Sequence, residues 1–136
     1  MRKTLLLFVI VLLVASCDDK SKDTQMTNID LKATSSDLVE NVGANGLDRF
    51  YSCHFSIPEI TSGVFNNGLV TAYIVLDNPT AQKALPFVYH FENTAGKILT
   101  QTIDFDYTVG GINVYVRNSD FAIDPSATMK FRVVIM

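Results

Sequence analysis

The stretch that decides the fold is "TQTIDFDYTVGGINVYVR", residues 100–117. Apolar and polar side chains alternate through it, which is the pattern of β-strands with one buried face. Two glycines divide the stretch, and glycine can take the positive φ angles that a tight turn needs. The sequence therefore predicts a β-hairpin that turns at Gly110–Gly111. Its inward face is expected to carry Ile103, Phe105, Tyr107, Val109, Ile112, Val114 and Val116.

The same alternation, and one continuous apolar run, predict five more strands along the chain. They cover residues 37–42, 50–57, 68–76, 84–91 and 129–136. The segment "GLVTAYIVL", 68–76, is apolar at nearly every position, which is typical of an interior strand covered on both faces. About seven short antiparallel strands predict an all-β fold, a single β-sandwich in which an immunoglobulin-like arrangement is one option.

Little helix is expected between these strands. The segment "PEITSGVF", 58–65, is the one expected helical turn, with Pro58 at its first position and Glu59 in its first turn. Asn66, Asn67 and Gly68 follow it and are expected to form a loop.

The first 28 residues differ in pattern from the rest of the chain. Arg2 and Lys3 precede the apolar run "LLLFVIVLLV", residues 5–14. Ten helical residues rise about 15 Å, half of the roughly 30 Å hydrocarbon core of a bilayer, so the run suits a signal peptide over 1–16. Residues 17–28 are mostly polar and are expected to form a flexible tether. The β-sandwich domain is then 29–136.

The segment "VASC", residues 14–17, resembles the bacterial lipobox. The resemblance implies that the thiol of Cys17 receives a diacylglycerol and that the signal peptide is cut just before it. Such a lipid holds a protein on a bilayer without crossing it. The membrane would then be a partner of the chain, through the lipid on Cys17. An ordinary cleaved signal peptide and an uncleaved anchor are the alternatives.

Four further motifs carry a second resemblance: "PEIT" at 58–61, "NNG" at 66–68, "LPF" at 85–87 and "FRVV" at 131–134. With the lipobox, they are similar to a group of small uncharacterised lipoproteins of the Bacteroidetes. The resemblance implies an exported protein on the outer membrane, at the cell surface or the periplasmic face, and it gives no activity. Asp18 and Asp19 resemble the export signal of surface lipoproteins in that group, whereas in enterobacteria an Asp at this position favours the inner membrane. Many members have a tryptophan in the first strand, and this chain has none.

Charge and cysteine usage argue against nucleic-acid binding and against a reactive thiol. The chain has 11 basic and 14 acidic residues, with no basic run, so no nucleic-acid partner is expected. If Cys17 carries lipid, Cys53 has no partner for a disulfide. Cys53 falls on the apolar face of "FYSCHFSI", 50–57, so we expect a buried and inert thiol.

The candidate site residues lie on the polar faces of the strands. Asp104 and Asp106 share one face, with β-carbons roughly 6.5–7 Å apart. This overlaps the carboxylate spacing of inverting glycosidases, although a calcium contact and a plain solvated face are alternatives. His54 and His90 also lie on polar faces, in no metal-binding spacing, so neither a metal nor a cofactor is expected.

Aromatic side chains opposite the inward stripes give the best indication of a ligand. Phe50 and Tyr115 could form a platform for a glycan or an envelope protein, unless a second sheet covers them. No catalytic residue is predicted. The sequence favours a lipid-anchored, non-catalytic binding or structural module of the cell envelope. The alternative is a small envelope hydrolase that uses the Asp/His strand face.

Overall fold

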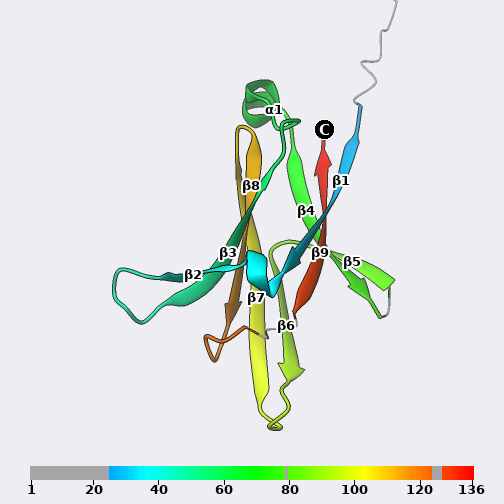
Figure 1. Ribbon diagram of the computed structural model, residues 1–136. Helices are drawn as coiled ribbons and strands as arrows, with labels where there is room; N and C mark the ends of the chain where they lie inside the picture. The colour runs from blue at the N-terminus through cyan, green and yellow to red at the C-terminus, as the bar shows by residue number, and fades with distance from the viewer. Residues whose placement is uncertain (1–24, 79, 124–126) are drawn as a thin grey trace, which may run out of the picture.

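The fold consists of two antiparallel β-sheets packed as an open sandwich (Figure 1). The structure, a computed structural model, describes residues 25–78, 80–123 and 127–136. The expected signal peptide and Cys17 therefore lie outside the described residues. The elements are β1 (Thr27–Thr34), a 3-10 turn η1 (Ser35–Asp37), β2 (Val39–Val42), β3 (Arg49–Ser56), α1 (Ser62–Asn67), β4 (Val70–Asp77), β5 (Thr80–Ala84), β6 (Phe87–Glu92), β7 (Ile98–Thr108), β8 (Gly111–Asn118) and β9 (Thr128–Ile135).

One sheet has four strands in the order β1-β9-β4-β5, and the other has five in the order β2-β3-β8-β7-β6. The β-sandwich prediction is confirmed, with nine described strands instead of about seven. The two additional strands are β1, which begins inside the segment expected to be tether, and the short exposed β5. The order differs from that of an immunoglobulin domain, because the last strand lies in the same sheet between β1 and β4.

The β7–β8 hairpin is confirmed, but its turn lies one residue earlier than expected. Thr108 pairs with Gly111, so Val109 and Gly110 form the turn, and only Gly110 takes a positive φ, of +88°. Val109 is 57% exposed because it is a turn residue, and the prediction that it faces inward is wrong. Gly111 belongs to β8, where an added Cβ would lie 2.5 Å from His54 Cε1 and 2.9 Å from the carbonyl oxygen of Phe55. Close packing, and not a positive φ, is what requires glycine at 111.

The helix begins four residues after the expected position. Thr61 is its N-cap and accepts a hydrogen bond from Val64 N at 3.2 Å, so Pro58 lies in the turn before the helix. That turn is fixed because Ile57 N donates to Gly110 O, and Gly110 N donates to Ile60 O, each at 2.8 Å. The expected loop residues 66 and 67 are the last turn of α1.

The core lies between the two sheets and is built from the inward positions of the strands. Its largest fully buried side chains are Phe131, Ile57, Ile60, Ile103, Ile112, Val114, Val116 and Val133. Cys53 is 6% exposed within this core, which confirms the buried position expected for it. β4 is an interior strand as predicted, but only one of its faces is buried, since Thr71, Tyr73 and Val75 lie on the outer side of the sheet. In the described part of the chain, no helix is long and apolar enough to cross a bilayer.

Candidate functional site

The outer face of the five-stranded sheet carries the predicted site residues. Strand register places His54 beside Asn113, and Asn113 beside Asp106, across β3, β8 and β7. The next row of the same face places Ser52 beside Tyr115, and Tyr115 beside Asp104. The fold therefore gathers Phe50, His54, Asp104, Asp106 and Tyr115 on three neighbouring strands.

A chain of hydrogen bonds links the first of these rows to the second. Asn113 Nδ2 donates to Asp106 Oδ1 at 2.7 Å, and the hydroxyl of Tyr115 donates to Asp106 Oδ2 at 2.7 Å. His54 Nδ1 lies 2.9 Å from Asn113 Oδ1. Because a carboxylate only accepts, Asn113 must present its amide nitrogen to Asp106 and its oxygen to His54, so His54 Nδ1 carries the proton. The hydrogen bond to Asp106 is the main reason that the pKa of Tyr115 is raised.

A shallow depression lies next to this network, and we call it the outer-face hollow. It has a volume of about 240 Å³ and is lined by Phe50, Thr102, Asp104, Tyr115 and Arg117. The rings of Phe50 and Tyr115 meet edge to face with centroids 6.0 Å apart. The guanidinium of Arg117 lies 5.5 Å from the Phe50 ring centroid. The expectation that Phe50 and Tyr115 share an outer face is therefore confirmed, and the second sheet does not cover them.

Ion pairing fixes the cationic side of the hollow. Arg117 Nε lies 3.1 Å from Asp48 Oδ1, in the loop between β2 and β3. This pair is half-exposed, so it orients the guanidinium more than it stabilises the fold. The hollow is smaller than a typical small-molecule pocket, which suits contact with one side chain or one sugar ring of a larger partner.

The two aspartates have different surroundings, although they share one strand face. Asp106 accepts hydrogen bonds from Asn113 and Tyr115, whereas Asp104 borders the hollow and accepts from the backbone N–H of Phe105. Asp106 is thus hydrogen-bonded to two β8 side chains, whereas Asp104 lies opposite Tyr115 of β8 and borders the hollow without a hydrogen bond to that side chain. Within the described ranges, no three His, Cys, Asp or Glu side chains form a group that could hold a metal ion.

The remaining predicted residue, His90, lies apart from this group. It is on β6 and its Nδ1 lies 2.9 Å from Thr100 Oγ1. β8 and β7 separate β6 from β3, so the two histidines are roughly 14 Å apart across the sheet alone. His54 and His90 therefore do not lie on neighbouring strands and do not form one site.

Sequence reasoning missed three members of the site: Thr102, Asn113 and Arg117. Their positions share the strand parity of Asp104 and Tyr115, which the alternation in residues 100–117 already contained. The order of the strands could not be predicted from the sequence, and the hollow forms only because β3 lies beside β8.

Cys53 lies on the opposite face of β3 from His54 and is not part of the site. Burial, with a smaller contribution from the charge of Asp37, raises the pKa of Cys53 to about 11. A thiol of this kind is protonated near neutral pH and is a poor nucleophile. Compared with models of protein families, with curated proteins and with solved structures, the chain has no match.

Proposed function

We propose that the protein is a lipid-anchored module of the cell envelope that binds a protein or glycan partner without catalysing a reaction. The observation that carries the proposal is the outer-face hollow, where Phe50, Tyr115 and Arg117 meet on a sheet face that the second sheet leaves open. Tyrosine and arginine are among the residues that contribute most to protein interfaces.

The rigidity of the face supports binding. Tyr115 is fixed by Asp106, Arg117 is fixed by Asp48, and the lining side chains all come from paired strands. A surface that is ordered before binding loses less conformational entropy when the partner arrives.

The hydrogen-bond pattern favours binding over the hydrolase alternative. A general base needs a nucleophile or a substrate proton within reach, and a carboxylate usually orients it. His54 instead directs Nδ1 to an amide, and Asn113 separates it from Asp106. Cys53 is on the far side of the same strand, in the core.

The anchor in this proposal rests on the lipobox resemblance at Cys17. Replacing Cys17 by Ala removes the only thiol that could carry the lipid. The variant should remain poorly processed or should leave the membrane as a soluble domain. If a processed Cys17→Ala chain still partitions into detergent, the lipid anchor is not what holds the protein.

The binding face is tested with the full chain, solubilised in detergent and immobilised, and exposed to the envelope fraction of cells that make it. Phe50→Ala should release whatever the wild type retains. Tyr73→Ala is the matched control, because Tyr73 is also a partly exposed aromatic residue, on the outer face of the other sheet. Equal loss in both variants would contradict the proposed face. If the chain hydrolyses esters, glycosides, peptides or phosphoesters, and Asp104→Asn or His54→Ala abolishes this activity, the hydrolase alternative would be correct and the binding proposal wrong.

A further inference from the structure

Large apolar side chains gather at one end of the sandwich, the end that carries α1. Five of the eleven large apolar residues that are exposed in the described chain lie there, and they are between 36% and 57% exposed. They are Met26, Phe65, Leu69, Val109 and Met136. In Figure 1 this end contains α1, the start of β1, the turn between β7 and β8, and the end of β9. We call these five residues the end patch.

Strand register places three members of the end patch in one row of the four-stranded sheet. β1 and β4 both pair with β9, and Ile135 is the last paired β9 residue on either side. The next row therefore consists of Met26, Met136 and Leu69. Leu69 N donates to Met136 O at 2.9 Å and Met136 N donates to Leu69 O at 3.0 Å, so the ladder continues into this row. Ile135 faces the core, which puts the row on the outer side of the sheet.

Phe65 and Val109 extend the end patch across the end of the sandwich. The ring of Phe65 on α1 meets the ring of Tyr107 on β7 edge to face, with centroids 5.8 Å apart. Val109 lies in the β7–β8 turn, two residues after Tyr107. Leu69 lies two residues after the end of α1, so a short segment joins Phe65 to the row on the other sheet. The end patch therefore draws on both sheets and on the helix between them.

The end patch is bordered by polar groups and by very little charge. Its end of the fold consists of residues 25–27, 57–70, 107–111 and 134–136, in which Glu59 is the only charged side chain. The other polar neighbours are uncharged. An exposed apolar patch with a polar rim is typical of a surface that contacts another protein or a lipid interface. Without a cation, binding to a bilayer would depend on the apolar area that is buried and not on anionic lipid.

The place where the chain enters the sandwich favours the bilayer. Met26 belongs to the end patch, and nine peptide bonds separate it from Cys17. Even a fully extended chain of that length spans at most about 32 Å. β1 (Thr27–Thr34) then leads away from this end for eight residues, or roughly 25 Å. A lipid on Cys17 would therefore hold the end patch closer to the membrane than the opposite end of the sandwich.

We propose that the end patch is a membrane-docking surface, which enters the interfacial layer of the bilayer when Cys17 carries its lipid. The inference rests on the lipid anchor of the proposed function and adds an orientation to it. With the α1 end toward the bilayer, the strands point away from the membrane. Phe50 and Arg117 lie near the ends of β3 and β8 that are remote from α1, so the outer-face hollow stays open to a partner.

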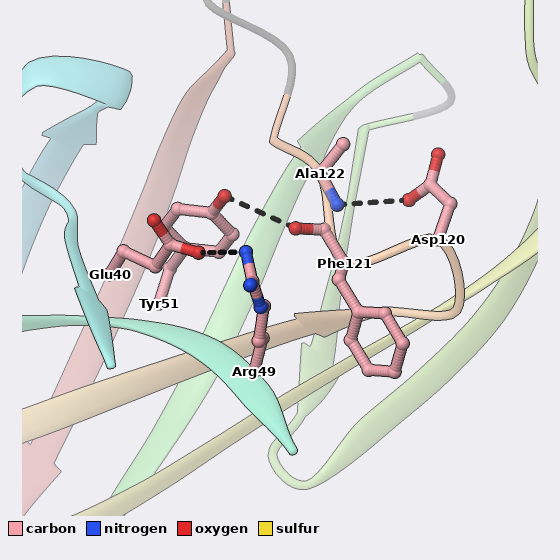
Figure 2. Close-up of polar contacts among 6 residues, drawn as sticks. All are labelled: Glu40, Arg49, Tyr51, Asp120, Phe121 and Ala122. Carbon is pink, nitrogen blue, oxygen red and sulfur yellow. Dashed lines mark hydrogen bonds and ion pairs between the residues drawn. The ribbon is translucent and has the colours of Figure 1, made fainter. Parts of the chain in front are cut away.

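Single tryptophans test this orientation, because the chain has none of its own. Phe65→Trp puts the probe in the end patch. Phe121→Trp is the matched control, since Phe121 is 43% exposed against 46% for Phe65 and lies beyond the opposite end of β8. Figure 2 shows that the backbone oxygen of Phe121, and not its ring, accepts from the hydroxyl of Tyr51, at 3.2 Å. The replacement of the ring leaves that contact in place.

Both variants are purified from membranes as the full chain and reconstituted in phosphatidylcholine vesicles, with and without brominated acyl chains. Flotation shows whether the chain is attached. The emission of Phe65→Trp should shift to the blue and be quenched about twofold or more by the brominated lipid, at low and at high salt. Phe121→Trp should show neither effect.

Second substitutions in the Phe65→Trp chain test whether the apolar surface itself makes the contact. Leu69→Asp should reduce the quenching by about half or more, because a carboxylate enters the apolar layer at a high cost. Val39→Asp is the control, at an exposed valine of β2 that is outside the end patch, and should leave the quenching unchanged.

Three results would overturn the docking while the lipid anchor stands. One is that the chain floats with the vesicles but Phe65→Trp is quenched no more than Phe121→Trp. Another is quenching that needs anionic lipid and is lost at high salt, which would assign the contact to charged side chains. The third is a dimer that Leu69→Asp dissociates, with no quenching, since a second copy would then cover the end patch. A chain that carries no lipid and does not float would refute the anchor, and the docking with it.

Discussion

Raising the pH should destabilise the fold through Cys53. The unfolded chain has an ordinary thiol, whose pKa is about 9.0, whereas burial and then the charge of Asp37 raise the pKa of Cys53 in the fold to about 11. The protonated thiol is therefore favoured by the folded state. Its contribution to stability is fully present below pH 9 and is lost as the pH rises through 11.

The magnitude follows from the two pKa values. At pH 10.5 the thiol of the unfolded chain is almost fully ionised, while most of the folded chain keeps its proton. With 1.36 kcal/mol for each unit of pKa, the free energy of unfolding should fall by about 2 kcal/mol between pH 8 and pH 10.5. The side chain is 6% exposed, so solvent screening reduces this value little.

Urea unfolding under reducing conditions measures this loss, in a Cys17→Ala background so that Cys53 is the single thiol. Tyr89, whose pKa is raised by burial, and Tyr115 also disfavour the folded state at high pH. Cys53→Ala is the control, because it keeps both tyrosines and removes only the thiol. Between pH 8 and pH 10.5, the free energy of unfolding should fall by about 2 kcal/mol more in the chain with Cys53 than in the Cys53→Ala chain. Parallel loss of stability in both, or fast labelling of the native thiol at pH 8, would refute the buried assignment.

Three substitutions test other parts of the fold by urea unfolding. Gly111→Ala should cost about 1–3 kcal/mol, because the added Cβ meets the carbonyl of Phe55 at 2.9 Å; an unchanged midpoint would contradict the packing described there. Tyr89→Phe should cost about 1–2 kcal/mol, since Gln101 Oε1 loses its donor, and a gain in stability would show that the contact is dispensable. Phe121→Gly relieves a positive φ that costs an ordinary residue about 1–2 kcal/mol. Glycine also raises the conformational entropy of the unfolded chain, which offsets about 0.5–1 kcal/mol of that gain in stability. Its stability should stay level or rise by up to about 1 kcal/mol, and a drop of more than that would mean that the ring, 43% exposed, packs more tightly than its exposure indicates.

Alternation along the chain was sufficient to predict the strands that bury one face. The hairpin of residues 100–117 and the burial of Cys53 both follow from it. β5 could not be found in this way, because "TAQKA" is an exposed edge strand with almost no apolar pattern. β1 has the pattern, with Ile29, Leu31 and Ala33 facing inward, but it directly follows a polar segment, so its first residues read as part of the tether.

Contacts between distant segments explain the other differences. Pro58 is a reasonable first residue of a helix, yet residues 57–60 are held as a turn by backbone hydrogen bonds to the tip of the β7–β8 hairpin. The candidate face could be predicted as a set of exposed side chains. Its arrangement could not, since the meeting of Phe50 with Arg117 depends on β3 lying beside β8.

Photo-crosslinking tests the central claim, that the outer face of the five-stranded sheet is the binding surface, most directly. p-Benzoylphenylalanine replaces Phe50 in the full chain, in cells that make the protein, and the same replacement at Tyr73 serves as the control on the other sheet. Irradiation should give discrete adducts from position 50 and none, or different ones, from position 73. No adduct from position 50, or the same set from both positions, would contradict the account.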